Sequence, residues 1–278
     1  MEWKDINWRK VERYVFKLQK RIFQASSHSN FQLVRKLQRT LTRSRQRLTL
    51  AQELSLKQKP LPARRILIPK ANGGNRPLSI PAMKDRACQA LVKLVLEPEW
   101  EARFEPNSFG FRPGRSAHDA IEAIFDSINK KSKWVLDADI SRCFDTIGHA
   151  YLLRKLNTSP TLERVIKAWL KAGWVFEGNK EESDFGTPQG SVISPLLANV
   201  ALHGMENRMT QLAESLKGDK VKNRTSLTFV RYADDFVCLH PDQEVIDKAK
   251  VILQEWLKEA GLEISEKKTR VTHTLKGF

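Results

Sequence analysis

Cysteine is scarce in this sequence, and its spacing excludes two kinds of small-domain scaffold. Only Cys88, Cys143 and Cys238 occur among the 278 residues, and none of them belongs to a CxxC or Cys/His pattern. A disulfide framework and a zinc site both need closer, paired spacings. We therefore expect three ordinary reduced cysteines in a protein core.

Long apolar runs and targeting signals are also missing. Nowhere do about 18 apolar residues follow one another, and the first residues lack the apolar run of a signal peptide. The sequence shows no internal repeat, no low-complexity tract, and no P-loop or kinase-type glycine loop. We expect an intracellular protein, cytoplasmic or organellar and not secreted, with no membrane partner, and neither an ordinary ATPase nor a kinase.

Acidic residues are few relative to basic ones, and the imbalance is local. The chain holds 48 Lys and Arg against 32 Asp and Glu, a net charge of +16. Residues 1–70 hold 18 Lys and Arg against 4 Asp and Glu, which leaves +14 there and +2 in the remainder. A basic arm ahead of a near-neutral body favours a nucleic-acid partner, although a solvated basic helix face would look similar.

Apolar residues at three- and four-residue steps predict two amphipathic helices in this arm. The first stripe comprises Trp8, Val11, Val15, Leu18 and Ile22, and the second comprises Phe31, Val34, Leu37 and Leu41. Lys and Arg fill the other faces of both helices. Such helices could lie on a membrane surface, but two of them ahead of a globular body favour RNA or DNA.

A β-hairpin is predicted after Pro60 and Pro62, with strands over 65–69 and 77–80 around an Asn-Gly-Gly-Asn turn. Lys70 and Arg76 flank the turn. A hairpin could aim both cations into one space to grip a phosphate chain. Surface charge beside a turn is the alternative.

Two further helices are expected downstream. One runs from Met83 to about Leu96 and ends near Pro98, and the other begins at Ser116, which has capping-box spacing with Asp119, and runs toward Ile128. The loop between them contains Phe109 and Phe111 among Arg and Gly residues. These rings could stack on bases or pack into the core.

An apolar strand from Trp134 runs into a group of acids. Asp137 and Asp139 lie two residues apart and therefore on the same face of a strand. Asp145 follows, where capping or turn formation is a sufficient explanation. Acids at the end of an apolar strand need a reason, and a catalytic role is one candidate.

A second acidic site interrupts the apolar residues 227–239. Asp234 and Asp235 lie between two strand-like runs, which predicts a hairpin with carboxylates at its turn. Turn formation alone could explain them. Adjacent carboxylates are most simply compensated by a divalent cation, and all-oxygen ligands favour Mg²⁺ over zinc.

Between the two acidic sites, residues 186–195 form a polar, glycine-containing run that enters an amphipathic helix through Leu196, Val200, Leu202 and Met205. Backbone N–H groups and the Gln189 amide could approach a substrate closely at such a turn. Helix capping alone would explain Ser194 and Pro195, but not the whole run.

Four motifs in order give the chain a resemblance to a known family. They are Leu136–Asp145, Thr187–Gly190, Tyr232–Asp235 and Gly261–Thr269. Together they resemble the group II intron reverse transcriptases, also called intron-encoded maturases. The resemblance covers about Leu61 to Phe278 and is looser across the basic helices.

The resemblance implies an α+β fold, a right-hand polymerase with fingers and palm, in which an antiparallel sheet is backed by helices. It assigns residues 1–58 to a basic helical N-terminal extension, 59–133 to the fingers and 134–278 to the palm, with a fingers-like helical insertion near 150–185. No thumb is expected within the chain.

The resemblance also assigns roles to individual residues. Asp139, Asp234 and Asp235 correspond to the catalytic carboxylates that hold Mg²⁺. The residues that correspond to nucleotide-binding positions are Lys70, Arg76, Phe144, Gln189, Gly190 and Lys268. Phe144 corresponds to the bulky residue beneath the nucleotide sugar, and Asp137 remains a structural neighbour. The implied partners are an RNA template, expected to be intron RNA, a DNA primer and deoxynucleoside triphosphates.

Two departures from the family pattern leave other readings open. A glycine-rich segment expected ahead of the fingers hairpin is missing, and the pattern stops before a last palm segment and a thumb or maturase domain. No nuclease domain is recognised. The main hypothesis is an RNA-directed DNA polymerase; the alternatives are a catalytically impaired RNA-binding splicing helper and a truncated remnant. The sequence does not identify the RNA, the insertion target or the oligomeric state.

Overall fold

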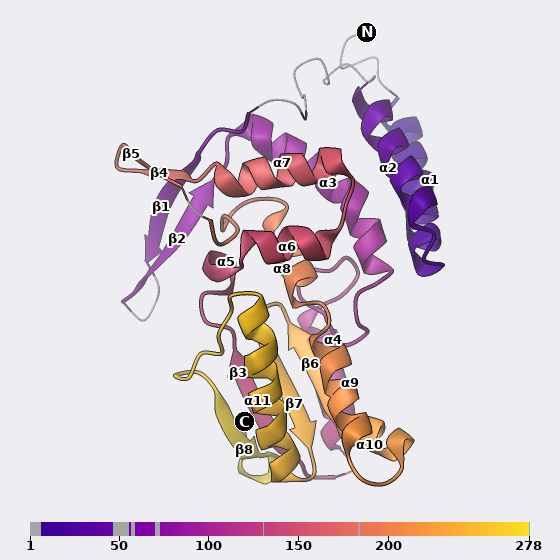
Figure 1. Ribbon diagram of the computed structural model, residues 1–278, viewed down its shortest axis with the longest axis vertical. Coiled ribbons are helices and arrows are strands. Elements are labelled where there is room, and N and C mark those ends of the chain that lie inside the picture. Colours follow the sequence, from indigo (N-terminus) through magenta and orange to yellow (C-terminus); the bar gives the residue numbers. More distant parts are fainter. Residues whose placement is uncertain are drawn as a thin grey trace. The chain divides into compact units, whose positions relative to one another are not determined.

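The computed structural model describes residues 7–46, 56, 59–69, 73–129, 131–182 and 184–277. The chain divides into two compact units, each built from two segments (Figure 1). The first unit comprises Met1–Phe104 with Leu153–Leu197, and the second comprises Glu105–Leu152 with Ala198–Phe278. Residues 105–133, which the sequence assigns to the fingers, therefore belong to the second unit, and the division at 133–134 stays a prediction.

The first unit begins with the two predicted amphipathic helices. They are α1 (Trp8–Ser27) and α2 (Phe31–Gln46). Ile22 and Val34 are fully buried, and α1 packs against both α2 and α3 (Met83–Glu101), as Figure 1 shows. The Asn7 side chain accepts a hydrogen bond from the Lys10 N–H at 3.1 Å and caps α1. The apolar periodicity thus predicts both helices correctly.

Helix α3 runs past Pro98, and the prediction that it ends there is wrong. A proline inside a helix leaves the carbonyl four residues earlier without its usual donor. Here that carbonyl belongs to Leu94, and the Gln19 side chain of α1 donates to it at 3.2 Å. Trp100, two residues beyond the proline, is fully buried. A donor from a neighbouring helix and a buried anchor carry the helix through the proline.

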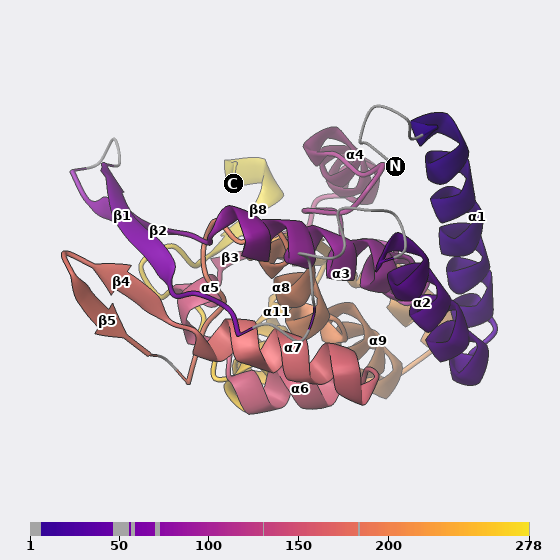
Figure 2. The same cartoon turned by 90° about the horizontal axis from the view of Figure 1, so that it is seen from above.

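The first unit contains a four-stranded sheet in the order β2-β1-β4-β5. Its strands are β1 (Ala63–Pro69), β2 (Asn75–Ile80), β4 (Trp174–Phe176) and β5 (Asn179–Glu181). The predicted β1–β2 hairpin is confirmed, with Ile66 opposite Leu78, and β1 pairs in parallel with β4. In Figure 2 these strands extend away from α3 and from α7 (Pro160–Lys171).

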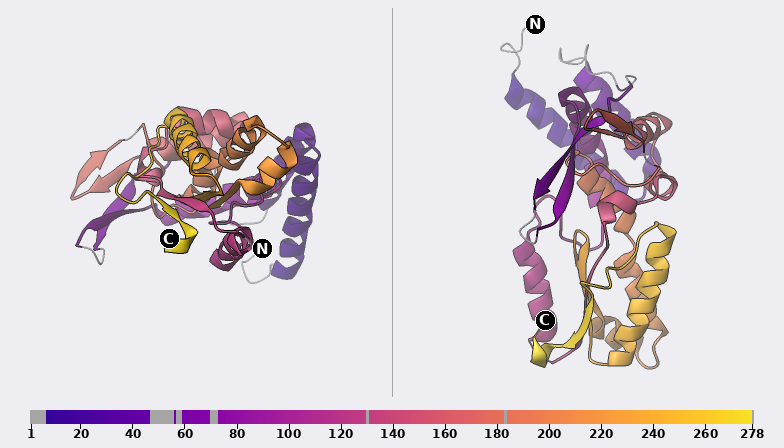
Figure 3. Two further views of the ribbon diagram at one scale, coloured as in Figure 1. Left: turned by 90° about the horizontal axis from the view of Figure 1, so that it is seen from below. Right: turned by 90° about the vertical axis from the view of Figure 1, so that its left-hand side faces the viewer.

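The second unit contains a four-stranded antiparallel sheet in the order β6-β7-β3-β8. Its strands are β3 (Trp134–Asp139), β6 (Thr228–Tyr232), β7 (Asp235–His240) and β8 (Arg270–His273). The helix α4 (Ala117–Ile128) lies on one face and α11 (Gln243–Glu259) on the other, as the right view of Figure 3 shows. An antiparallel sheet backed by helices confirms the α+β prediction.

The remaining elements are short or contain residues of both units. They are α5 (Cys143–Thr146), α6 (His149–Leu156), α8 (Ser194–Leu202), α9 (Met205–Ser215), α10 (Lys220–Ser226) and the 3-10 turn Thr274–Lys276. The predicted amphipathic helix through Met205 is instead two helices, because Gly204 adopts a left-handed φ of 107° between them. Leu197 and Ala198 are both buried, so α8 is apolar on more than one face.

Two local predictions agree with the structure. Cys88, Cys143 and Cys238 are free and buried. The capping box at Ser116 and Asp119 is present at the start of α4. Among the helices that the structure describes, none combines the length and apolar character needed to cross a membrane.

Candidate active site

The carboxylates singled out in the sequence occupy the ends of two adjacent strands. Asp139 is the last residue of β3, and Asp235, the first residue of β7, is its partner in the antiparallel register. Asp234 lies in the turn between β6 and β7, and its carbonyl accepts a hydrogen bond from the Ile140 N–H at 3.1 Å. The structure therefore brings all three predicted carboxylates to one end of the two inner strands of the second-unit sheet.

Crowding of negative charge shows in the protonation of Asp235. Partial burial, the charge of Asp234 and contact with Asp139 together raise the pKa of Asp235 to about 6. A carboxyl group shifted upward in this way is stabilised when a cation arrives, because the charged form then gains a partner. The electrostatics thus favour a positive ligand beside these three side chains.

Lys268 supplies one cation from a distant part of the chain. Its Nζ donates to Asp139 Oδ2 at 2.7 Å, although the lysine side chain is 66% exposed. The hydrogen bond to Asp139 raises the pKa of Lys268. The backbone is tied to the same strand end, because the Ser265 N–H donates to the Asp139 carbonyl at 2.8 Å. The predicted site residue Lys268 therefore contacts the carboxylate cluster.

Asp137 shares the strand and the face of Asp139 but has a different partner. Its carboxylate lies 3.7 Å from a guanidinium nitrogen of Arg270 on β8. Asp145 lies in the short helix α5, in line with a capping or turn role. Neither residue joins the cluster of Asp139, Asp234 and Asp235.

Phe144 lies in α5, five residues after Asp139 at the end of β3. Its ring meets the Phe111 ring edge-on, with centroids 6.1 Å apart and planes at 79°. Phe111 has a left-handed φ of 60° and is 49% exposed, whereas Phe109 is buried in a core cluster. The two rings of the predicted loop thus have different roles, and only Phe111 lies beside a predicted site residue.

A second group of predicted residues comes together in the first unit. Arg76 Nε donates to the Gln189 side-chain carbonyl at 3.2 Å, and the Gln189 backbone carbonyl accepts from the Ser79 N–H at 2.6 Å. Gly190 has a φ of 103°, and a Cβ there would lie 2.9 Å from the Ser79 carbonyl oxygen. Only glycine allows this close approach to β2. Lys70, also predicted here, lies outside the described residues.

The donor set bears on the fit of a metal ion. Among the described residues no cage of three or more His, Cys, Asp or Glu side chains could hold a metal ion on its own. Mg²⁺ is commonly held by one or two carboxylates together with water and substrate phosphates, so it needs no such cage. The paired ends of β3 and β7, with the raised pKa of Asp235, fit an ion of this kind.

Sequence reasoning missed the buried residues that surround the acidic turn. Arg231, directly before the turn, is 1% exposed and contacts Ser108, Asn199 and Ala233. A charged residue inside the apolar run of residues 227–239 was an available signal. Asn199 and Ser108 lie 32 and 123 positions away from Arg231, so the pattern could not identify them.

Comparison with known proteins places these residues in a wider context. Residues 68–277 match the family described as "Reverse transcriptase (RNA-dependent DNA polymerase)", and residues 3–54 match the "N-terminal domain of reverse transcriptase". The first match spans most of the chain and contains every carboxylate of the cluster.

Two curated relatives are similar over most of this chain. Protein YkfC of Escherichia coli (strain K12) is 33% identical over 253 residues, which cover 79% of this chain and 65% of YkfC. The group II intron-encoded protein LtrA of Lactococcus lactis subsp. cremoris is 30% identical over 274 residues, covering 77% of this chain and 45% of LtrA. The chain thus spans about two thirds or less of the length of these relatives.

Solved structures show the same fold at low sequence identity. The telomerase of Candida albicans, solved with a fragment of telomeric RNA, aligns with a TM-score of 0.60 and 16% identity. The alignment covers 78% of this chain and 43% of the telomerase chain. At this identity the likeness concerns the fold alone.

Proposed function

Because the chain belongs to the reverse transcriptase family of RNA-dependent DNA polymerases, we propose that it is an RNA-directed DNA polymerase of the group II intron type. The observation that carries the proposal is the meeting of Asp139, Asp234 and Asp235 at paired strand ends. In the reaction a primer 3′-hydroxyl attacks the α-phosphate of a deoxynucleoside triphosphate, a new phosphodiester bond forms, and pyrophosphate leaves.

Asp139, Asp234 and Asp235 would hold Mg²⁺. Bound there, Mg²⁺ would supply electrostatic stabilisation of charge that develops on the phosphate oxygens. The chain's own contribution is to place these carboxylates together at the strand ends. The raised pKa of Asp235 supports this role, because it marks a place where negative charge lacks sufficient compensation.

Lys268, which already donates to Asp139, is suited to stabilise negative charge on the leaving pyrophosphate. In the first unit, Arg76 and Gln189 are proposed to bind the incoming nucleotide, and their mutual hydrogen bond fixes the orientation of both side chains. Gly190 lets the same turn lie against β2. Lys70 keeps its proposed role as a second cation of the hairpin.

The template is proposed to be RNA, specifically intron RNA, and the primer DNA. The basic helices α1 and α2 support an RNA partner, because residues 1–70 carry most of the net charge of the chain. The similarity to a group II intron-encoded protein supports the choice of intron RNA.

Primer extension by the full chain on an RNA template tests the proposal. Asp235→Asn should reduce extension by about a thousandfold or more, because the cluster loses a charge needed at the reacting phosphate. Asp137 lies on the same face of β3 as Asp139 but is paired with Arg270, so extension by Asp137→Asn should stay within about twofold of wild type. Extension by Asp235→Asn at the wild-type rate would refute the mechanism. RNA binding without extension by the wild-type chain would favour a splicing helper instead.

Phe144 tests the choice of sugar. A ring beneath the sugar would collide with a 2′-hydroxyl, so Phe144→Val should lower the preference for deoxynucleotides over ribonucleotides by about tenfold or more. Phe125→Val on the exposed side of α4 is the matched control and should leave the preference unchanged. Competition between the two nucleotide classes in primer extension measures it, and unchanged selectivity in Phe144→Val would remove Phe144 from this role.

A further inference from the structure

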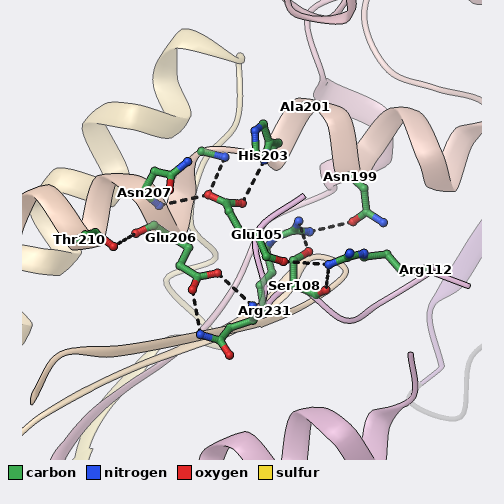
Figure 4. A network of polar contacts seen from close by, with 12 residues as sticks. Glu105, Ser108, Arg112, Asn199, Ala201, His203, Glu206, Asn207, Thr210 and Arg231 are labelled. Carbon is green, nitrogen blue, oxygen red and sulfur yellow. Dashed lines mark hydrogen bonds and ion pairs between the residues drawn. The ribbon is translucent and has the colours of Figure 1, made fainter. Parts of the chain in front are cut away.

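Arg231, the residue that precedes the acidic turn, is buried in a polar network of the second unit. Its side chain is 1% exposed, and Figure 4 shows it among Ser108, Asn199 and two glutamates. Removing a guanidinium from water is costly unless its donors are satisfied. The hydrogen bonds of Arg231 therefore show which parts of the unit the buried side chain connects.

The backbone of Arg231 is held along both edges of β6. On one edge Arg231 pairs with Phe236 of β7. On the other, its N–H donates to the Asn107 carbonyl and its carbonyl accepts from the Phe109 N–H, both at 2.9 Å. The start of the acidic turn is therefore fixed from two sides.

The side chain of Arg231 reaches forward over the turn. Nη1 donates to the Ala233 carbonyl and to Asn199 Oδ1, each at 2.9 Å, and Nη2 donates to Ser108 Oγ at 2.5 Å. The Asn199 amide in turn donates to the Gly110 carbonyl at 2.8 Å. One guanidinium thus joins the turn to two other segments of the unit.

Ala233 needs such support. Its φ of 58° is a left-handed conformation, which costs a non-glycine residue about 1 kcal/mol or more. The two residues that follow are Asp234 and Asp235, whose charges repel. A turn with both a left-handed residue and two neighbouring negative charges persists only when surrounding contacts hold its conformation.

The neighbouring loop closes on the same residue. A Cβ added at Gly110 would lie 2.3 Å from the Ala233 backbone nitrogen, too close for any real contact. Gly110 has no left-handed φ, so the limit there is space and not conformation. The turn is thus held by a hydrogen bond from Arg231 and by direct packing against Gly110.

The charge of Arg231 is balanced inside the same network. Burial lowers the pKa of Arg231 to about 10, and the charge of Glu105 opposes this shift, so the guanidinium stays protonated at neutral pH. Glu105 accepts from the Gly204 and Asn207 N–H groups at 2.9 and 3.1 Å (Figure 4). The charge of Glu105 therefore helps to keep Arg231 protonated in its buried position.

We infer that Arg231 is a positioning residue that holds Ala233 and thereby presents Asp234 and Asp235 to the metal ion. The inference rests on the proposed function, which assigns metal binding to these carboxylates. A purely structural Arg231 would affect the stability of the unit but not metal affinity in the folded protein.

Two variants test the inference by different routes. Arg231→Lys keeps the charge but replaces the two-pronged donor with a single nitrogen. Gly110→Ala leaves Arg231 intact and pushes directly on Ala233. Gly148→Ala is the matched control, because its Cβ would meet only ordinary contacts, the nearest at 3.5 Å, and Gly148 has no left-handed φ.

The measurement is the Mn²⁺ dissociation constant of each full-length variant, from electron paramagnetic resonance of the free ion, with thermal unfolding to confirm that the protein is folded. Arg231→Lys and Gly110→Ala should each raise the dissociation constant about tenfold, as loss of a residue that orients metal ligands does. Gly148→Ala should match wild type. In primer extension both test variants should lower kcat more than they change the KM for deoxynucleotide.

Wild-type dissociation constants in folded Gly110→Ala and Arg231→Lys would overturn the inference while the proposed function stands. If Arg231→Lys does not fold, Gly110→Ala alone decides between the two results. The wild-type chain could bind Mn²⁺, lose that binding in Asp235→Asn, and yet extend no primer. That result would contradict the proposed function, and the dissociation constants of Arg231→Lys and Gly110→Ala would still decide the inference.

Discussion

Two groups of polar residues in the second unit, the acidic turn with Asp139 and the network around Arg231, contain two acids with opposite pKa shifts, Asp235 and Glu105. The contrast concerns these two acids, because burial also raises the pKa of Glu206 in the Arg231 network. The pKa of Asp235 is raised to about 6 by partial burial and by its carboxylate neighbours. Burial would also raise the pKa of Glu105, but the hydrogen bond and charge of His203, the Asn207 N–H and the charge of Arg231 together lower it. The more buried acid is the one that prefers its charged form. Protein partners favour the charged form of Glu105, whereas the neighbouring carboxylates disfavour the charged form of Asp235, which a bound cation would stabilise.

The largest expected effect comes from removing the charge of Glu105 from the network around Arg231. Glu105→Gln removes the charge that faces Arg231 and weakens the hydrogen bonds from Gly204 and Asn207. A buried guanidinium left without its counter-charge should cost about 3 kcal/mol of unfolding free energy. Urea denaturation at neutral pH measures it. Glu259→Gln, at an exposed position near the end of α11, should change stability by less than about 0.5 kcal/mol. Equal effects of the two changes would mean that Glu105 does not compensate Arg231.

The pH dependence of stability should separate the two groups by sign. Since Asp235 binds its proton more tightly in the folded protein, the stability that this group contributes without metal should fall as pH rises from about 4 to about 6. Asp235→Asn should remove that fall, worth no more than about 1 kcal/mol after solvent screening. Glu105 has the lowered pKa, so its contribution is present above its ordinary pKa and is lost as the solution becomes more acidic. Denaturation midpoints against pH in the presence of a chelator measure both trends. A stability of Asp235→Asn that falls with pH as in wild type would contradict the assignment.

The smallest expected effect concerns Lys268, a cation that contacts Asp139 of the acidic group. It competes with a metal ion for Asp139, so Lys268→Ala should tighten Mn²⁺ binding by about two- to fivefold, the range of an exposed ion pair. The same change should slow primer extension, because the lysine is proposed to act on the leaving group. Weaker Mn²⁺ binding in Lys268→Ala would show that the lysine supports the metal site instead of competing with it.

Local sequence patterns predicted their elements correctly, whereas features that depend on contacts between distant residues were missed. The apolar periodicity of α1 and α2 and the apolar run of β3 are local patterns, and the structure confirms the elements that they predict. The predicted end of α3 at Pro98 is wrong because the donor to the Leu94 carbonyl comes from Gln19, far away in the sequence.

The acidic group was accessible to sequence reasoning because its members stand side by side or at a strand end. The group around Arg231 was not, because Ser108 and Asn199 reach it from distant segments that carry no motif of their own. Similarly, the contact between Lys268 and Asp139 joins residues 129 positions apart, and only the family resemblance had assigned Lys268 to the site.

Mn²⁺ titration of Asp235→Asn and Asp137→Asn, read by electron paramagnetic resonance, tests most directly whether Asp139, Asp234 and Asp235 form the metal site. The two variants make the same chemical change on adjacent strands of one sheet, but only Asp235 lies in the crowded cluster. We predict that Asp235→Asn weakens Mn²⁺ binding by about tenfold or more and that Asp137→Asn binds as wild type does. Equal binding by wild type and Asp235→Asn would contradict the metal-holding role of the cluster.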